Sequence, residues 1–407
     1  MNCRHCAKPL RHTFLDLGFA PPSNAYLTEG DLKRPEMYFP LKIMVCDACW
    51  LVQTEDYSEA DALFSSDYAY FSSTSATWLE HAARYAEAMT AKLGLHSKSM
   101  VVELASNDGY LLKNFVAKNI PCLGIEPTAS TAAVAEGLGI PVLREFFGEA
   151  LGKSLAAKGQ KADLIAGNNV YAHVPDINDF TLGMKALLKV GGTITLEFPH
   201  LMELLKHRQF DTVYHEHFSY LSLFTVSKIF KQAGLRIYHV EQLPTHGGSL
   251  RIYGCHADDS QPTTDDVRQI LSEEAGLDMQ SLPVYLAFQD KADQVKNALL
   301  AFLLDCKQKG KKIAAYGAAA KGNTVLNYAG VKPDLLPLVC DAALAKQGKY
   351  MPGSHIPILP PSALRAAPLD YVLILPWNIA GEVQSQLRDL AEAGTKFVTA
   401  VPELTIH

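Results

Sequence analysis

Two closely spaced cysteine pairs near the start of the chain constrain its fold more than any other feature. Cys3 and Cys6 form one Cys-x-x-Cys pair, and Cys46 and Cys49 form the other. Each pair offers two sulfurs from a tight turn, and a loop that folds back brings four thiolates around one tetrahedral zinc ion. Because four sulfurs leave no position for water or substrate, we expect one structural zinc ion. A disulfide pair and an iron–sulfur centre are the alternatives.

The first residues also indicate the compartment. Met1 leads directly into Asn2 and Cys3, without an apolar signal segment. We therefore expect a cytoplasmic protein whose thiols stay reduced. The other cysteines lack ligand spacing, so we expect small buried apolar side chains at Cys122, Cys255, Cys306 and Cys340.

Composition and charge narrow the classes of partner. The chain has 407 residues, of which 48% are hydrophobic and 20% charged, and its length predicts two or three domains. A net charge of −6 gives no general electrostatic reason to bind nucleic acid or an anionic membrane. No apolar run reaches the roughly 18 residues that span a bilayer. We expect no nucleic acid, no membrane, and a monomer or weak homodimer.

Strands and helices alternate through the middle of the chain. This order predicts an α/β Rossmann-like fold, a parallel sheet with helices on both faces. A helical pattern over 78–93 precedes the alternation, and strand patterns over 236–243 and 249–253 predict an antiparallel edge. The alternating strand patterns cover 99–104, 122–125, 162–167 and 193–198, and the helical ones cover 111–118, 129–136, 180–188 and 227–233.

Four regions follow from these patterns. Residues 1–75 hold the cysteines and two short strand patterns, and this stretch is small enough to need a metal to stabilise it. The Rossmann-like region covers 76–258, and a linker that becomes helical covers 259–300. A second, smaller Rossmann-like domain, with its own alternation of strands and helices, covers 301–407.

The turn after the first strand of the middle region indicates a cofactor site. Small and polar residues from Ala105 to Gly109 let a ligand approach the backbone at the carboxyl end of the sheet. Glu126 ends the next strand, where a carboxylate suits the two hydroxyls of a ribose. The pattern is not Gly-x-Gly-x-x-Gly, so a pyrophosphate cradle is poorly supported. S-adenosylmethionine, which has no phosphate, is favoured over a nicotinamide dinucleotide.

Two further clusters carry titratable groups. Asn168 and Asn169 follow the third strand, and His173 comes shortly after them, either in the crevice or as a satisfied loop residue. The segment from Tyr214 to Tyr220 holds the densest set of titratable and hydroxyl groups. Histidine and tyrosine can exchange protons near neutral pH, which favours a catalytic role. A second metal on His215-x-His217 and a solvated sheet edge are the alternatives.

Taken together, these segments resemble the sugar C-methyltransferases, which use S-adenosylmethionine to alkylate a ring carbon of a nucleotide-linked 4-keto deoxysugar. The resemblance covers essentially the whole chain. One departure is visible, because Ala105 stands where the methyltransferase turn usually has glycine. The segments that carry the resemblance are the paired cysteines, Glu103–Leu112 (ELASNDGYLL), Gly167–Asp176 (GNNVYAHVPD), Tyr214–Leu221 (YHEHFSYL) and His246–Tyr253 (HGGSLRIY).

The resemblance implies roles for individual residues. His217 is the expected base, with His173 as its rival or assistant. Glu216 is a sugar contact or orients the base, Tyr214 binds the enolate or a hydroxyl, and Tyr68 is a further catalytic tyrosine. Tyr70 and His215 are expected at the substrate. The expected donor contacts are Glu103, Ala105, Asn107, Gly109, Tyr110, Glu126, Pro127, Asn168 and Asn169.

The C-terminal domain offers a second candidate ligand site. Gly317 to Asn323 join a strand at 312–316 to a helix, and small residues, Lys321 and a helix N-terminus suit a phosphate. We expect this turn to hold the pyrophosphate of a nucleotide-sugar, with Asp341 and Tyr350 near the same crevice. A tight turn with a solvated lysine is the alternative.

The expected function is methylation of carbon 3 of a dTDP-linked 4-keto-6-deoxyhexose through an enolate. Methylation of carbon 5, or of a GDP- or CDP-linked sugar, is the close rival. A zinc-containing nicotinamide oxidoreductase and a non-catalytic nucleotide-sugar-binding protein are alternatives from other classes.

Overall fold

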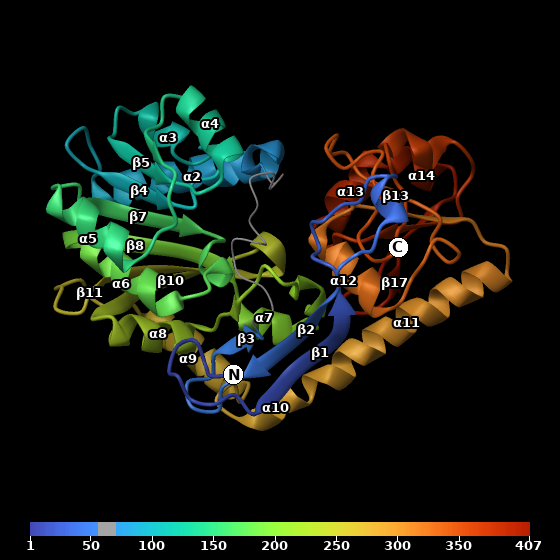
Figure 1. Ribbon diagram of the computed structural model, residues 1–407, viewed down its shortest axis with the longest axis horizontal. Coiled ribbons are helices and arrows are strands. Elements are labelled where there is room, and N and C mark those ends of the chain that lie inside the picture. The colour runs from blue at the N-terminus through green and yellow to red at the C-terminus, as the bar shows by residue number, and fades with distance from the viewer. Residues whose placement is uncertain (56–70) are drawn as a thin grey trace.

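A computed structural model describes residues 1–55 and 71–407. The expected substrate-side tyrosines, Tyr68 and Tyr70, lie outside the described residues. Three sheets organise the remainder, with four, seven and six strands. Two α/β lobes stand side by side, and the four-stranded sheet lies between them at their base (Figure 1).

The seven-stranded sheet forms the core of the larger lobe. Its strand order is β10-β11-β8-β7-β4-β5-β6, and only β11 runs against its neighbours. The chain moves from β4 outward to β6 and then returns to β7, so a ligand crevice is expected at the carboxyl ends of β4 and β7. The strands are β4 (Val101–Leu104), β5 (Cys122–Ile125), β6 (Val142–Leu143), β7 (Ala162–Asn168), β8 (Leu188–Pro199), β10 (Leu235–Leu243) and β11 (Ser249–His256).

Helices cover both faces of this sheet, as its alternating sequence predicts. One buried cluster joins α2 (Ala76–Leu93), α3 (Lys113–Val116) and α4 (Ala129–Gly137) to one face. Another joins α5 (Glu149–Ala157), α6 (Ile177–Leu187) and α8 (Leu223–Gln232) to the other face. The predicted helix over 111–118 is shorter in the structure, and α5 has no counterpart among the predicted helices.

The four-stranded sheet is antiparallel and mixes distant parts of the chain. Its order is β1-β2-β3-β9, with β1 at His12–Ala20, β2 at Phe39–Val45, β3 at Val52–Thr54 and β9 at Ser219–Tyr220. In the β3–β9 ladder, Val52 pairs with Tyr220 and Gln53 with Ser219. The strand that follows the expected base therefore belongs to the sheet of the cysteine-rich region.

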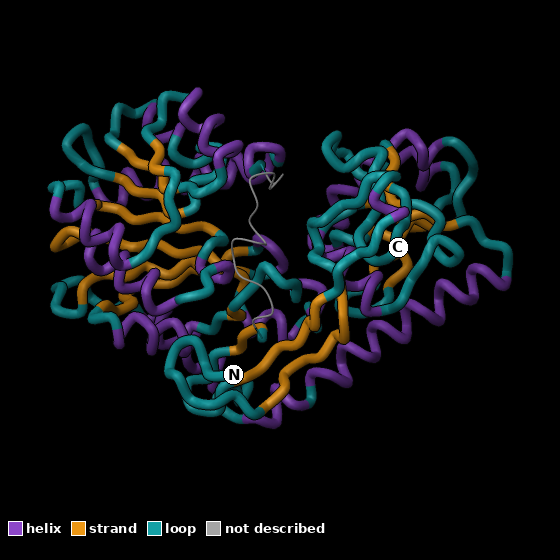
Figure 2. Tube along the Cα trace, in the orientation of Figure 1, coloured by secondary structure: helices purple, strands orange, loops and turns teal. Residues whose placement is uncertain are grey.

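The smaller lobe contains the six-stranded sheet, in the order β14-β13-β12-β15-β16-β17. It is parallel except for β17, which confirms a second α/β unit. Figure 2 shows how much loop surrounds its short strands. The elements are β12 (Ile313–Tyr316), α12 (Ala320–Tyr328), β13 (Val339–Cys340), β14 (Ile358–Leu359), β15 (Tyr371–Ile374), α13 (Ala380–Gln386), α14 (Arg388–Glu392), β16 (Lys396–Thr399) and β17 (Thr405–Ile406).

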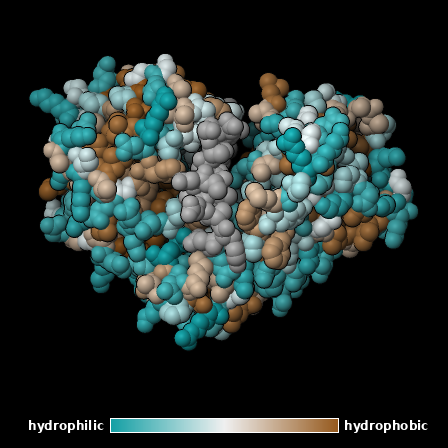
Figure 3. All heavy atoms as spheres, in the orientation of Figure 1, coloured by the Kyte–Doolittle hydropathy of each residue, from teal (hydrophilic) through white to brown (hydrophobic). Residues whose placement is uncertain are grey.

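Helices connect the two lobes. α9 (Asp265–Gly276) and α10 (Leu282–Leu286) lead into the long α11 (Phe288–Gln308), which runs beneath the smaller lobe (Figure 1). Figure 3 shows hydrophilic and hydrophobic residues mixed over the visible face of both lobes. Across residues 1–55 and 71–407, no helix is both long enough and apolar enough to traverse a bilayer.

Candidate active site

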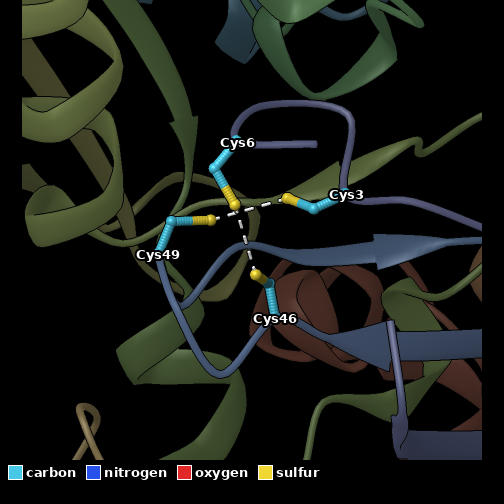
Figure 4. Close-up of side chains that lie close together, drawn as sticks. All are labelled: Cys3, Cys6, Cys46 and Cys49. Atoms are coloured by element: carbon cyan, nitrogen blue, oxygen red, sulfur yellow. Dashed lines mark hydrogen bonds between the residues drawn. The ribbon is translucent and has the colours of Figure 1, made fainter. Parts of the chain in front are cut away.

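The four N-terminal cysteines converge as their spacing predicts. All four sulfurs lie within 4.8 Å of one another, and the Cys3–Cys49 and Cys6–Cys46 pairs are each 3.5 Å apart (Figure 4). Zinc–sulfur bonds of about 2.3 Å in a tetrahedron place sulfurs about 3.8 Å apart, so this group fits zinc. All eight cysteines are free thiols, and a disulfide here is therefore wrong.

Side chains around the sulfurs fix this group to the rest of the protein. Gln53 Nε2 donates to Cys3 Sγ at 3.2 Å, and the Arg4 backbone N–H donates to Gln53 Oε1 at 2.9 Å. On the larger lobe, Thr225 Oγ1 donates to the Cys49 carbonyl at 3.3 Å. Within the part of the chain that the structure describes, these cysteines are the only group arranged to ligate a metal.

The turn after β4 is unusual in its backbone. Ala105, Asn107 and Gly109 all have positive φ, at 56°, 49° and 79°. The Glu126 carboxylate holds the turn, because it accepts hydrogen bonds from the backbone N–H groups of Asn107 at 2.9 Å and Thr128 at 2.8 Å. Its remaining lone pairs are available to ribose hydroxyls.

Gly109 is required for packing as well as for its φ. A Cβ there would lie 2.5 Å from Ile140 Cδ1 and 3.1 Å from Ala135 Cβ, so the glycine lets α4 approach the turn that follows β4. The atoms that come close to the Gly109 backbone are therefore protein side chains of Ala135 and Ile140.

Ala105 occupies the left-handed region, which costs a residue with a Cβ about 1–2 kcal/mol. We expect Ala105→Gly to raise the free energy of unfolding by up to about 1 kcal/mol, after the larger entropy of unfolded glycine is subtracted. Urea unfolding of both proteins checks this result. Ala135→Gly, a change within helix α4, should instead destabilise the protein by about 1 kcal/mol. If Ala105→Gly were less stable than the unaltered protein, the left-handed backbone at Ala105 would not be strained.

Buried polar groups collect around the carboxyl ends of β4 and β7. Neither amide atom of Asn168, a residue only 8% exposed, has a hydrogen-bond partner. Glu103 is fully buried, and burial raises its pKa well above the ordinary value, although a hydrogen bond from Tyr110 opposes this. Unmet polar atoms at this edge fit a polar donor such as S-adenosylmethionine. Pro127 is half-buried beside Glu126.

Asn169 links the donor edge to the loop before β11. Its Nδ2 lies 3.0 Å from His246 Nε2, and its backbone N–H donates to the Glu197 carbonyl at 2.7 Å. The indole of Trp78 stacks on His81, with ring centroids 4.9 Å apart, and lies 5.5 Å from the His246 ring. Aromatic rings therefore lie close to Asn169 at the donor edge.

His217 lies buried at the centre of the expected catalytic segment. Its Nδ1 is 2.8 Å from the Thr212 carbonyl, which can only accept, so Nδ1 carries the proton and Nε2 keeps a lone pair. Burial first, and then the neighbouring His173, lower the pKa of His217 well below its ordinary value. The ring is therefore neutral at pH 7, the form that a general base requires.

His173 lies close to His217. Their ring centroids are 4.6 Å apart in a T-shaped arrangement. Burial lowers the pKa of His173 to about 4, partly offset by a hydrogen bond to the Glu216 backbone. The structure thus brings the two candidate bases together, both uncharged.

The backbone from Tyr214 to His217 is a turn, closed by a hydrogen bond from the His217 N–H to the Tyr214 carbonyl at 3.0 Å. In a regular strand Glu216 and His217 would point to opposite faces, so they could act together only on irregular backbone. This turn provides such a backbone. The Tyr214 ring lies 4.0 Å from the His217 ring. Asn24 Nδ2 donates to both Glu216 oxygens, at 2.8 and 3.0 Å. The contact that orients His217 is made by the Thr212 carbonyl.

His215 points away from His217. Its Nε2 lies 3.3 Å from the Phe39 carbonyl and 3.2 Å from the Pro40 carbonyl, against β2. The two imidazoles thus bind different backbone groups, and a shared second metal is not supported.

Lys321 lies where the lobes meet and is largely buried. Its Nζ donates to the His246 carbonyl at 3.2 Å and to Asn378 Oδ1 at 3.4 Å, and it sits 5.0 Å from the Trp377 ring centre. Burial lowers its pKa, although Asp211 opposes this. A solvated lysine, the alternative for this turn, is therefore wrong.

The neighbouring residues of this turn make protein contacts. Asn323 Nδ2 donates to the Ser23 carbonyl at 2.7 Å, and a Cβ on Gly317 would lie 2.4 Å from Pro376 Cδ. Asp341 accepts from the Ala318 N–H at 2.7 Å, and the Tyr350 backbone pairs with Leu27. The contacts of Asn323 and Tyr350 join the smaller lobe to the N-terminal segment, and the other two lie within the lobe.

Sequence reasoning missed a buried charged network beside the crevice. Glu197 Oε2, fully buried at the end of β8, lies 3.0 Å from both Arg251 Nη2 and His81 Nε2. Although burial opposes it, these two partners hold the pKa of Glu197 below its ordinary value. Arg251 lies in the segment HGGSLRIY, which supported the family resemblance, but no role was predicted for Arg251 itself. Asn24 had no sequence signal.

Comparisons with known proteins agree with this architecture. Family models match a zinc binding domain at residues 3–64, a methyltransferase domain at 78–240 and the C-methyltransferase C-terminal domain at 244–402. The C-methyltransferase NovU of Streptomyces niveus is 32% identical over 402 residues, which cover 99% of this chain and 96% of that one. The chain belongs to the C-methyltransferase family.

Two solved methyltransferase structures are among those that match part of this chain. The magnesium protoporphyrin IX methyltransferase of Synechocystis PCC 6803 with bound SAH is 14% identical, with a TM-score of 0.35, and the match covers 43% of this chain and 82% of that one. An S-adenosylmethionine-dependent methyltransferase from Mesorhizobium loti is 15% identical, with a TM-score of 0.34, covering 43% and 99%.

This protein is therefore an S-adenosylmethionine-dependent C-methyltransferase with a structural zinc site. The alternatives of a nicotinamide oxidoreductase and a non-catalytic binding protein are wrong, because the matched family transfers methyl groups to carbon.

Proposed function

We propose that this enzyme methylates carbon 3 of a dTDP-linked 4-keto-6-deoxyhexose through an enolate. The observation that carries the proposal is His217, a neutral imidazole with Nδ1 bound to the Thr212 carbonyl and Nε2 available as a base. The sugar and its carbon position rest on the combined motifs, above all Tyr214–Leu221 and His246–Tyr253.

Carbon needs a base before it can attack a methyl group. The ketone at position 4 acidifies the neighbouring C–H bond, and His217 Nε2 removes that proton. A positioned base contributes about 10²–10⁴-fold to such a step. S-adenosylmethionine supplies an electrophilic methyl group when bound. The groups from Glu103 to Tyr110, with Glu126, Asn168 and Asn169, are proposed to place it at the carboxyl ends of β4 and β7.

Tyr214 and Glu216 are proposed to hold the sugar beside His217. A hydroxyl donor at the developing enolate oxygen contributes about 10²–10³-fold, and Tyr214 lies against the His217 ring. Glu216, held by Asn24, accepts hydrogen bonds from sugar hydroxyls. Because Asn24 comes from the N-terminal segment, the zinc-containing region also contributes to this proposed sugar site.

The smaller lobe is proposed to hold the nucleotide. Lys321 is a buried cation that donates hydrogen bonds to two uncharged oxygens, so its charge can attract a pyrophosphate. Gly317, Asn323, Tyr350 and Asp341 shape this junction through the contacts described above.

Incubation of the zinc-loaded enzyme and S-adenosylmethionine with separate dTDP-, GDP- and CDP-linked 4-keto-6-deoxysugars tests the proposal. We expect mass spectrometry to show a product heavier by one CH₂ with the dTDP-sugar, and NMR to place the methyl on carbon 3. The same sugars reduced to the alcohol at carbon 4 serve as matched controls and should not react. Methylation of oxygen, or of the reduced sugars, would contradict the enolate.

A further inference from the structure

A small internal cavity lies against His217. It has a volume of about 10 Å³, just enough for one water molecule. His217, Thr212, Ser219 and His200 are among its lining residues. Two polar atoms of these residues, Ser219 Oγ and His200 Nδ1, are buried without a hydrogen-bond partner. Unmet polar atoms in so small a space are the setting in which buried water is found.

His200 is oriented by a buried carboxylate. Its Nε2 lies 2.7 Å from Glu274 Oε1, and both side chains are only 1% exposed. Glu274 also accepts from the backbone N–H groups of Leu223 at 2.6 Å and Phe224 at 2.9 Å, at the start of α8. Because the carboxylate accepts from His200 Nε2–H, the lone pair of His200 lies on Nδ1 and can receive a proton.

His200 also reaches a second, larger pocket that opens toward the surface. This outer pocket has a volume of about 370 Å³, and Glu203, Gln242 and Ser249 are among its lining residues. His200 is the residue that lines both the inner cavity and the outer pocket within the described chain. It therefore stands between the expected base and the exterior.

We propose that His200, oriented by Glu274, carries the substrate proton from His217 to the outer pocket through a water in the inner cavity. This inference rests on the proposed function, in which His217 gains a proton in every turnover. That proton must leave before the next cycle, and His217 is itself buried.

The proton balance of the relay closes without another reactant. The C–H bond breaks, its electron pair stays on the sugar as the enolate, and His217 becomes an imidazolium. His217 gives one proton to the cavity water, and that water gives one of its own to His200 Nδ1. The Glu274 carboxylate stabilises the resulting imidazolium of His200. Solvent that enters from the outer pocket then takes the proton from His200 Nδ1, so His200 returns to its Nε2–H form and His217 is again neutral.

The test compares the unaltered zinc-loaded enzyme with His200→Gln, using dTDP-4-keto-6-deoxyglucose and S-adenosylmethionine as the probes. Glutamine keeps an N–H for Glu274 but cannot carry a proton. We expect kcat to fall by about 10-fold or more and to recover as imidazole is added, with both KM values unchanged. Imidazole fits the outer pocket and replaces the missing acceptor.

His207→Gln is the matched control, because His207 is exposed and directly follows α7 (Leu201–Lys206), the helix that His200 directly precedes. It should neither lower kcat nor respond to imidazole. Ser219→Val fills the inner cavity from strand β9, so it should lower kcat, and imidazole should not restore it. This variant tests the relay if His200→Gln does not fold.

Two results would overturn the relay. One is an unchanged kcat in His200→Gln, and the other is a lower kcat that imidazole does not restore while zinc content and unfolding temperature stay the same. An unaltered enzyme that forms no methylated product would contradict the proposed function, and with it the relay.

Discussion

Replacing His217 by Asn should lower kcat for C-methylation by about 10²–10⁴-fold, the contribution of a positioned base. Both KM values should stay within about three-fold, because Asn can still donate to the Thr212 carbonyl and keep the turn. The fall in kcat is expected because Asn lacks Nε2, the atom whose lone pair is left available when Nδ1 donates to the Thr212 carbonyl. Product formation by mass spectrometry and loss of solvent-deuterium exchange at the sugar carbon measure the effect.

His173→Asn and His215→Asn are the matched controls for this prediction. His173 lies beside His217, so its replacement should lower kcat less than loss of the base does. His215 binds backbone carbonyls near β2, and its replacement should leave deuterium exchange intact. A larger loss in His173→Asn than in His217→Asn would transfer the role of base to His173.

The pH dependence of kcat/KM follows from the same residue. His217 acts when neutral, and burial places its pKa well below the ordinary value of about 6.5. Activity should therefore fall with decreasing pH only as the pH passes through this lowered pKa. We expect a plateau that continues from about pH 8 to below pH 6.5, with an acid limb only at lower pH. This limb should be absent from the residual rate of His217→Asn.

Loss of zinc should unfold the four-stranded sheet and inactivate the enzyme. Cys46→Ser, or a strong chelator, should lower the free energy of unfolding by at least about 4 kcal/mol, since metal loss is among the most destabilising changes. Activity should fall because β3 pairs with β9, and Thr54 Oγ1 donates to the His217 carbonyl at 3.3 Å. Thermal unfolding with measured zinc content checks the first effect, and kcat the second.

Cys306→Ser provides the matched control, because Cys306 is a buried thiol in α11, which contributes no ligand to the metal group. It should lower stability by about 1 kcal/mol and leave zinc content and kcat unchanged. A chelated enzyme that keeps full activity and its unfolding temperature would show that the cysteines do not support the catalytic turn.

The features best predicted from sequence are those with local signals. The cysteine spacing predicted a four-sulfur group, and strong apolar runs located β4, β5 and β7 to within a few residues. The antiparallel edge made by β10 and β11 was also confirmed. In each case the pattern of neighbouring residues, and not a distant contact, decides the structure.

The features that sequence reasoning missed depend on distant contacts. The two-residue strand β9 exists because β3 supplies its partner. The stretch 259–300, predicted as a linker that becomes helical, contains α9. The burial of Glu274 in α9 was not predicted, because it depends on contacts with His200 and the start of α8. Lys321 is buried only because the other lobe covers it. No local pattern encodes these partners.

The ladder between β3 and β9 limits how this enzyme can be divided. Cutting the chain before residue 71 would keep every strand of the seven-stranded sheet and still remove the neighbour of Ser219 and Tyr220. It would also remove Asn24, which holds Glu216. An excised central lobe could therefore retain its topology while losing the support of its chemistry, so grafting this activity onto another scaffold means transferring residues 1–55 with it.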